Sequence, residues 1–424
     1  MALGERAAAE RDWGELFSAF GRIGLLSFGG PAGQIALMHR VLVDERRWLS
    51  EERFLHALNF CMLLPGPEAM QLATYCGWLL RGVAGGILAG LLFVLPGFCV
   101  VLGLSILYVT LGDVPLVAGL LLGLKAAVLA IVAEALARVS RKGLRGRWQA
   151  VVAISAFVAI ALFGVPFPLV ILAAALIGLA FARPVRREAP PVPISHVHVA
   201  RTLTVWLAIW LLPVAATVTL VGSVWGREAL FFSQAAVVTF GGAYAVLAYV
   251  AQRAVEDFGW LAPGEMATGL GLAESTPGPL ILVLVFVGFM GGHGVDGSLW
   301  GGAFGALITA WVTFAPCFLW IFLGAPYVER LDAGGRASSA LAGVTAAVVG
   351  VIANLAVWFA LQVLFGTVGE TVHGPLTVWT PDPATFQWRP FLIAGVAASM
   401  LWRHVDVLWT LAVAALLGIA LQWT

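Results

Sequence analysis

Charged side chains are scarce in this chain. Lys, Arg, Asp and Glu together make up 11% of its 424 residues, whereas hydrophobic residues make up 61% and the mean hydropathy is +0.95. A water-soluble domain of this length needs a much more polar surface, so the composition excludes that class and is typical of a polytopic membrane protein. Each crossing takes about 20 residues, and the length therefore allows roughly a dozen spans. We expect an all-α, multi-pass membrane protein.

Paired cysteines, metal-ligand clusters and catalytic motifs are absent from the sequence. The four cysteines lie far apart in apolar segments without CxxC spacing, and we interpret them as reduced thiols that pack as small hydrophobic groups. No two histidines stand at metal-ligand spacing on one expected helix, and neither a Ser/His/Asp arrangement nor a phosphate-binding loop is visible. We therefore expect no metal, no cofactor, no enzymatic activity and no ATP-driven pump.

A basic excess and a cleavable leader are missing as well. The formal net charge of +1 gives no reason to expect binding to nucleic acid. Residues 1–12 hold no short apolar core followed by a small-residue cleavage site. We therefore expect the first hydrophobic helix to stay in the lipid bilayer.

The sequence does contain one stretch that occurs twice. Residues 27–67 begin with SFGGP and end with PGP, and residues 239–279 begin with TFGG and end with PGP. The offset between the copies is the same at both ends, 239 minus 27 and 277 minus 65, and it equals half the length of the chain. Helix-breaking residues thus recur at the same places in two apolar segments, and we expect two homologous halves.

The glycines and prolines of the repeat predict interrupted helices. Unpaired backbone groups are tolerated at membrane depth only where protein or a water-lined cavity satisfies them. We expect broken helices over residues 13–40 and 229–252, and re-entrant hairpins over residues 54–80 and 266–290, because the arms of the hairpins are too short to span. The other expected helices cover residues 84–110, 114–139, 148–163, 167–182, 202–224, 298–323, 337–362, 390–402 and 405–422, with a polar loop over residues 366–389.

The distribution of basic residues predicts how the halves are oriented. Basic runs at residues 138–147 and 183–187 fall on one expected face of the first half, which the positive-inside rule makes cytoplasmic. One additional helix would turn the second half over. We therefore predict an inverted repeat, with an N-terminal transporter repeat at 1–187, a linker plus one additional transmembrane helix at 188–228 and a C-terminal repeat at 229–424. Transporters of that design hold their substrate near the midplane, where the broken helices meet.

Helix ends at the breaks favour an anion. A half-helix that starts inside the membrane presents unpaired N–H groups and the positive end of its dipole, equivalent to roughly half a charge. Glycines, prolines, hydroxyls and amides beside the breaks complete the predicted binding site, which consists of Ser27, Gly29, Gly30, Gln34, Gly66, Pro67, Gln71, Thr239, Gly241, Gly242, Tyr244, Ser275, Thr276 and Gly278. The alternative is that these glycines and prolines serve close helix packing and kinks.

Lys125 is an intramembrane charge with no local partner. It lies near the centre of the helix expected over 114–139, on the face opposite Glu134, which is placed to pair with Arg138 at i, i+4. Such charges are costly and usually functional, so we predict that Lys125 contacts the anion. The alternative is a contact with carbonyls or a carboxylate of a neighbouring helix.

Three further charged residues stand near the breaks. Arg22 is a secondary charge that lies within reach of either the cavity or the lipid headgroups. Glu68 directly follows the first PGP, and Glu274 occupies the approach to the second. We predict both carboxyls as proton-coupling candidates, and capping of a helix is the alternative role for each.

Several of these motifs resemble the chromate ion transporter family. They are FGGP at 28–31, DERRWL at 44–49, LPGPEAMQLA at 64–73, TFGGAY at 239–244 and TPGP at 276–279. Two-domain members of that family have this size and internal duplication, so the resemblance covers nearly the whole chain. It implies export of chromate from the bacterial cytoplasm across the inner (plasma) membrane, driven by the membrane potential or the proton gradient, with resulting chromate resistance and with sulfate as a related oxyanion.

The second copy departs from the first at two positions of these motifs. Pro31 corresponds to Ala243 and Glu68 to Leu280, so we expect the first copy to carry more of the chemistry. With the cell interior negative, expelling a dianion releases about 4.6 kcal/mol per 100 mV, from roughly 2.3 for each charge. The alternatives are a carrier of sulfate or another oxyanion, a passive anion channel and an intramembrane enzyme. Beyond the oxyanion and the lipid bilayer, a homodimer stays open as a partner.

Overall fold

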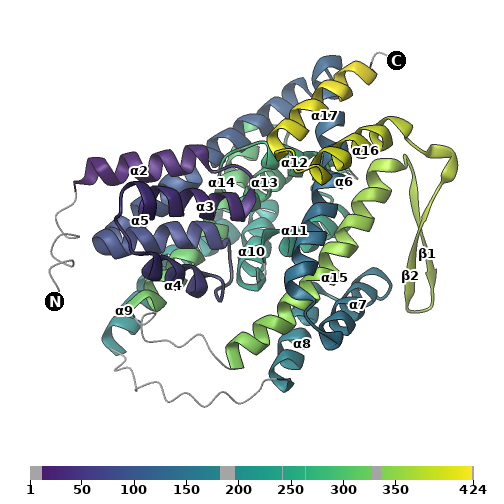
Figure 1. The fold of residues 1–424 in the computed structure, drawn as a ribbon. Helices are drawn as coiled ribbons and strands as arrows, with labels where there is room; N and C mark the ends of the chain where they lie inside the picture. Colours follow the sequence, from purple (N-terminus) through teal and green to yellow (C-terminus); the bar gives the residue numbers. More distant parts are fainter. Residues whose placement is uncertain (1–11, 182–195, 241, 263, 327–335, 423–424) are drawn as a thin grey trace. The chain divides into compact units, whose positions relative to one another are not determined.

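The computed structural model describes residues 12–181, 196–240, 242–262, 264–326 and 336–422 (Figure 1). Five of the described helices are long and apolar enough to cross a membrane. An 18-residue stretch within each of these helices has a mean hydropathy between 2.0 and 2.6. The expected all-α, multi-pass membrane fold is therefore confirmed.

The first copy of the repeat folds into interrupted helices and then into longer ones. Its elements are α2 (Trp13–Leu26), α3 (Gly30–His39), the π-helix η1 (Arg40–Glu45), α4 (Glu51–Cys61), α5 (Glu68–Leu111), α6 (Pro115–Gly143), α7 (Arg147–Ala161) and α8 (Phe167–Ala180). The breaks expected at residues 29–31 and 65–67 are both present, between α2 and α3 and between α4 and α5. Helix α5 is interrupted at Arg81 and Gly82, where the φ of Gly82 is +62°, so the hairpin arm ends where the sequence predicted.

One additional helix precedes the second copy, which then repeats the order of the first. Helix α9 (His196–Ala216) continues into the π-helix η2 (Thr217–Val221), as the additional helix predicted from the sequence. The second copy then folds as α10 (Ser223–Val238), α11 (Ala243–Gln252), η3 (Arg253–Asp257), α12 (Glu265–Glu274), η4 (Leu280–Leu282), α13 (Val283–His293), α14 (Leu299–Gly324), α15 (Arg336–Leu364), α16 (Trp388–Trp402) and α17 (Val407–Gln422). A turn at residues 294–298 occupies the place of the break at Gly82.

The two copies agree down to single backbone hydrogen bonds. The N–H of Trp48 donates to the carbonyl of Leu42 over 2.7 Å, and the N–H of Trp260 donates to the carbonyl of Ala254 over 2.8 Å. Donor and acceptor of the second bond follow their counterparts at the offset of the sequence repeat, 260 minus 48 and 254 minus 42. The duplication read in the sequence is therefore a duplication of local conformation.

The structure corrects the prediction of a polar loop over residues 366–389. It contains an antiparallel hairpin of β1 (Val368–His373) and β2 (Leu376–Pro381), in which Val368 is opposite Pro381 and His373 is opposite Leu376. Threonine and valine recur through both strands and favour extended backbone, and Gly374 turns the chain at φ +62°. The low hydropathy of the segment suggested a loop, but the β-branched residues decided its structure.

The described chain forms two compact units, and each unit takes elements from both copies. Unit 1 holds α2 to α4, α5 as far as Gly103, then α9, α10, η4, α13 and α14. Unit 2 holds the end of α5, then α6 to α8, nearly all of α11, α12 and α15 to α17. The domain boundaries predicted at residues 187 and 228 stay a prediction.

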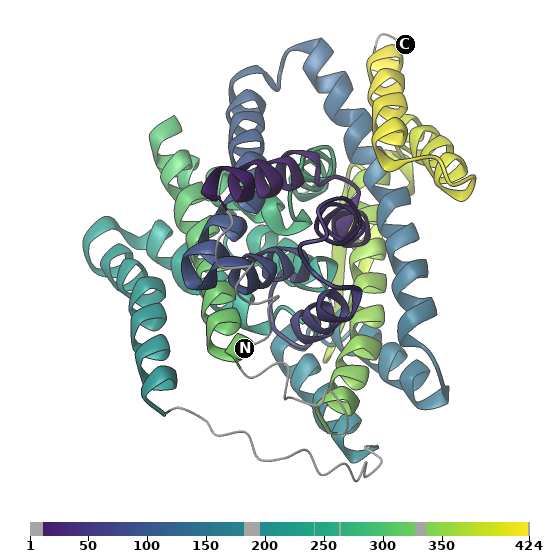
Figure 2. The ribbon, with the colours of Figure 1, turned by 60° about the vertical axis from the view of Figure 1, so that its left-hand side comes forward.

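In unit 2 the long helix of each copy packs on the short hairpin of the other copy. Helix α6 packs against α16 and α17, seen in Figure 2 as blue and yellow neighbours, and α15 packs against α7 and α8. Gly123 of α6 meets the backbone at Ala414, and Gly343 of α15 meets the backbone at Ala174. A side chain at either glycine would collide with the opposing helix, so small residues set these close crossings.

In unit 1 helix α14 is the central element. Helices α9, α10 and α13 pack against it, and large aromatic side chains fill the space between them. The fully buried aromatic side chains on these helices include Phe232 of α10, Phe286 and Phe289 of α13 and Phe322 of α14.

Candidate functional site at the helix breaks

The four interruptions of the repeat meet in pairs within unit 1. The N–H of Gly66, in the first PGP, donates to the carbonyl of Thr239 over 2.7 Å, and the N–H of Gly278, in the second PGP, donates to the carbonyl of Ser27 over 2.8 Å. The two glycines are related by the offset of the repeat, 278 minus 66, and so are the two acceptors, 239 minus 27. Each hairpin tip therefore caps the end of the broken helix of the other copy, as a two-fold relation between the copies requires.

Glycine is required at both hairpin tips by backbone angle and by space. Gly66 has a φ of +118° and Gly278 a φ of +95°, a region that residues with a Cβ rarely adopt. A Cβ at Gly66 would also collide with the Cys317 sulfur and the Gln71 amide. One at Gly278 would collide with Leu282. The two PGP motifs thus encode a tight contact between copies.

Glycine is required at the starts of the second half-helices for a different reason. Gly29, Gly30 and Gly242 have φ values of +81°, +73° and +102°, yet open space surrounds the position that a Cβ would take. Helix α3 begins at Gly30 without a side-chain cap, and η4 follows Pro279 without one. Backbone N–H groups at these starts are left for a ligand or water, which makes them attractive to an anion.

Two amides of the first copy also lie at the breaks. The Nε2 of Gln34 donates to the carbonyl of Gly278 over 2.7 Å, and the Nε2 of Gln71 donates to the carbonyl of Pro65 over 2.7 Å. Both side chains are buried, and among the described residues neither Oε1 has a hydrogen-bond partner. The cluster is therefore polar and incompletely satisfied inside an otherwise apolar unit.

Three of the predicted hydroxyl donors are already engaged. The hydroxyls of Ser27 and Thr239 each donate over 2.6 Å to the carbonyl four residues earlier, and the hydroxyl of Ser275 donates to the carbonyl of Leu272. Their protons serve their own helices in this conformation, so backbone N–H groups are the more available donors. Gly241 lies outside the described residues.

Tyr244, Ser275, Glu274 and Lys125 of the predicted site belong to unit 2. The hydroxyl of Tyr244 donates to Glu274 over 2.5 Å, which joins the start of α11 to the end of α12. Their part in anion binding stays a prediction.

Lys125 lies against the start of α12. A side chain added at Gly264 would collide with its ammonium group, and the ammonium interacts electrostatically with Glu265, which also accepts the hydroxyl of Tyr108 over 2.8 Å. The arrangement matches the alternative of a carboxylate on a neighbouring helix. The expected pair of Glu134 and Arg138 is present at 3.1 Å.

Arg22 and Glu68 have specific surroundings in unit 1. The guanidinium of Arg22 pairs with Glu45 of η1 over 2.6 Å, with both side chains more than a third exposed. Glu68 is half-buried and is the first residue of α5, where a carboxylate favours the positive end of the helix dipole. Their predicted roles as secondary charge and proton carrier stay predictions.

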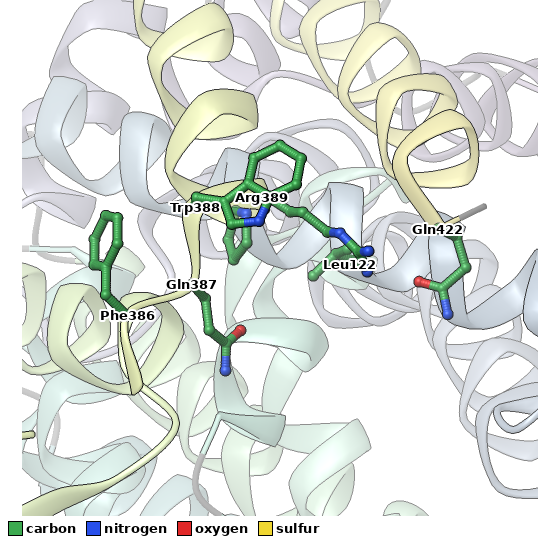
Figure 3. Close-up of a pocket in the computed structure, with 7 residues that line it drawn as sticks. Leu122, Phe386, Gln387, Trp388, Arg389 and Gln422 are labelled. Atoms are coloured by element: carbon green, nitrogen blue, oxygen red, sulfur yellow. The ribbon is translucent and has the colours of Figure 1, made fainter. Parts of the chain in front are cut away.

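A surface hollow elsewhere in the chain contains none of the predicted residues. Its volume is about 390 Å³, and Figure 3 shows its lining, with the Arg389 guanidinium near Trp388. The lining residues all belong to unit 2 and are Leu122, Phe386, Gln387, Trp388, Arg389, Pro390 and Gln422. None of the lining residues therefore belongs to the breaks of unit 1.

One buried charge was missed from the sequence. The broken segment of the second copy was expected from residue 229, and this boundary left out Glu228, which is 0% exposed in α10. Comparing position 228 with position 16, its counterpart in the repeat, would have found it, because a leucine stands there in the first copy.

Comparison with known proteins decides the family. The profile of the chromate transporters matches residues 14–179 and residues 226–419, two segments whose starts are again separated by the offset of the repeat, 226 minus 14. The chain belongs to the chromate transporter family. The profile covers both copies of the repeat and the breaks that meet in unit 1.

Relatives of this chromate transporter family member are similar over most of their length. A probable chromate transport protein of Synechococcus elongatus is 30% identical over 398 residues, which covers 92% of this chain and 95% of that protein. The chromate transport protein of Pseudomonas aeruginosa is 35% identical over 342 residues, or 80% and 79% of the two chains. That of Cupriavidus metallidurans is 30% identical over 346 residues, or 80% of each. No solved structure matches this chain.

Proposed function

We propose that this protein exports chromate from the bacterial cytoplasm across the inner membrane and thereby confers chromate resistance. The observation that carries the proposal is the reciprocal pair of hydrogen bonds from Gly66 to Thr239 and from Gly278 to Ser27. It joins the four helix interruptions in two pairs within unit 1, and the names of the relatives supply the oxyanion.

The chemistry of the cluster suits a tetrahedral dianion. Such an ion must exchange its hydration shell for fixed donors, because an uncompensated charge in a dry interior costs on the order of tens of kcal/mol. Helix starts without side-chain caps at Gly30 and Leu280, with open space beside Gly29 and Gly30, offer backbone N–H groups for this purpose. No metal ion or cofactor takes part in the proposal.

The two copies are proposed to run in opposite directions across the membrane. Two observations support this orientation: basic residues are more frequent in the first half, and the additional helix α9 separates the two copies. The two-fold pattern of hydrogen bonds is compatible with it. Cysteine accessibility from each side of the membrane tests it. A cysteine placed in the loop before α7 and one placed in the β1–β2 turn are expected to react from opposite sides.

The decisive experiment measures radiolabelled chromate flux in proteoliposomes under separately imposed voltage and pH gradients. Saturable flux that either gradient drives supports the carrier. Inhibition by excess sulfate at concentrations that leave chromate saturable would favour a general oxyanion carrier. Current that rises with concentration without saturating, and that ignores the pH gradient, would show a passive anion channel instead and contradict the proposal.

A further inference from the structure

Glu228 is a buried carboxyl that the proposed anion site does not use. It lies in α10 of unit 1, with 0% of its surface exposed, and among the described residues neither carboxyl oxygen has a hydrogen-bond partner. Its neighbour Arg227 in the same helix is exposed. A carboxyl in that position is costly to the fold and calls for a functional reason.

The carboxyl faces a close helix crossing of unit 1. Gly305 of α14 meets the backbone of Gly288 of α13, and a Cβ on Gly305 would come within 3.0 Å of the Oε2 of Glu228. The hydroxyl of Thr309, one turn further along α14, lies against Gly288, and it is buried without a hydrogen-bond partner among the described residues. A carboxyl and a hydroxyl, both unsatisfied, thus stand at one crossing of three helices.

The other copy shows that the fold does not need these polar groups. The counterpart of Glu228 in the first copy is Leu16, and the counterpart of Thr309, which follows the insertion after α13, is Ala89. Both are 0% exposed. The same helical arrangement is therefore filled by apolar side chains in the first copy, and a purely structural role for Glu228 has no support in the packing.

The surroundings determine the charge state of Glu228. The described elements that pack against α10 are α9, η2, α13 and α14, and their titratable or charged groups are His196, His198, Arg201, His293 and Cys317. His293 lies within hydrogen-bond distance of the carbonyl of Ser298, and Cys317 lies beside Gly66 and Gln71. Burial, rather than a neighbouring charge, dominates the environment of Glu228. Burial without an opposite charge nearby favours the neutral, protonated form of a carboxyl.

We propose that Glu228 is a proton-binding site of this transporter, an inference that rests on the proposed function. In the conformation described, a carboxyl oxygen carries the proton as an O–H group. When the crossing of α10 with α13 and α14 opens to water, the O–H bond breaks, the proton passes to water and the carboxylate stays behind. Proton movement is thereby tied to the conformational change that moves the oxyanion.

The test uses two variants of the full chain and one control in proteoliposomes. Glu228→Gln keeps the shape and cannot ionise, and Glu228→Leu installs the residue of the first copy. Glu15→Gln removes an exposed carboxylate next to Leu16 as the control. Chromate exchange at equal pH and zero voltage reports on the transport cycle, and accumulation driven by a pH gradient with the voltage clamped reports on coupling to protons.

Both Glu228 variants are expected to fold, with thermal unfolding at or above the wild-type temperature, and to keep exchange. Accumulation driven by the pH gradient is expected to fall roughly tenfold or more, within the usual range of coupling between two sites. Glu15→Gln is expected to behave as the wild type. Coupled accumulation by Glu228→Gln at the wild-type level would overturn the proton site, and so would loss of folded protein in both variants.

Two further results separate this proposal from the proposed function. A wild type without any chromate flux would refute the proposed function itself, whereas wild-type flux with unaltered coupling in Glu228→Gln would refute only the role of Glu228. Accumulation that follows a Na⁺ gradient at fixed pH, and that Glu228→Gln abolishes, would overturn the proton in favour of a cation. Infrared spectra of the wild type should show a protonated carboxyl band at neutral pH that Glu228→Gln lacks, and absence of that band in the wild type would contradict the proposal.

Discussion

The two copies of the repeat share their helix breaks and the hydrogen bonds between them, but they carry different polar side chains. Around the breaks, the first copy carries Gln34 and Gln71 where the second has valines at 246 and 283. At the crossing of α10 and α14 the difference is reversed, because the second copy carries Glu228 where the first has Leu16. Both copies keep the backbone hydrogen bonds that join the breaks. Each of these buried polar side chains, in contrast, occurs in only one copy.

The largest effect is expected where the copies are alike. Gly30→Val and Gly242→Val each force a β-branched residue into a left-handed conformation, which costs more than the roughly 1–2 kcal/mol of an ordinary residue. Both should abolish chromate resistance while the protein stays in the membrane, which immunoblots of membrane fractions check. Gly21→Val is the matched control, since Gly21 also has open space around it but no positive φ. Resistance that survives both changes would refute the site at the breaks.

The next largest effect is expected at the two buried amides that only the first copy carries. Gln34→Val and Gln71→Val install the residues of the second copy and leave the carbonyls of Gly278 and Pro65 without their donors. Each should lower the free energy of unfolding by about 1–3 kcal/mol and reduce chromate flux. Denaturation of the purified protein and flux in proteoliposomes measure the two effects. Wild-type values in both assays would show that the amides are dispensable and that the copies are equivalent here.

A moderate effect is expected at Lys125, whose counterpart in the second copy is Thr345. Lys125→Thr should weaken chromate uptake by everted vesicles. If the pair with Glu265 carries that effect, Glu265→Gln should weaken uptake similarly and the double variant should lose less than the sum of the two. Unchanged uptake by Lys125→Thr would remove this residue from the anion site.

The smallest effect concerns His39, whose counterpart is Ala251. Its ring hydrogen-bonds Glu51 over 2.5 Å and faces Asp44, and the bond to Glu51 together with both negative charges raises the pKa of His39 despite partial burial. A raised pKa in the folded state means that the pair stabilises the fold below the unfolded pKa of about 6.5, and that this stabilisation is lost as the pH rises through the folded value. The unfolding temperature of the wild type should therefore exceed that of His39→Ala by a larger margin at about pH 6 than at about pH 8. A pH-independent difference would argue against the ion pair.

Much of the fold was readable because its signals are local. Glycine and proline interrupt a helix by their own stereochemistry, so the breaks at Gly30, Gly66, Gly242 and Gly278 appear in the structure where the sequence placed them. The hairpin of β1 and β2 was missed because its polar residues outweighed its threonines and valines in the hydropathy. Family membership followed from the same local motifs, since they are contiguous stretches of sequence.

The sequence by itself determined that the helices break at Gly30, Gly66, Gly242 and Gly278 and that the chain is duplicated. Only the tertiary structure decided which breaks meet, namely Gly66 with Thr239 and Gly278 with Ser27, and that the long helix of each copy packs on the hairpin of the other. It also decided that Arg22 faces Glu45 and that Glu228 is buried without a partner among the described residues. The physical reason is that a break depends on the torsion angles of one residue, whereas a partner depends on packing between segments that lie in opposite halves of the chain.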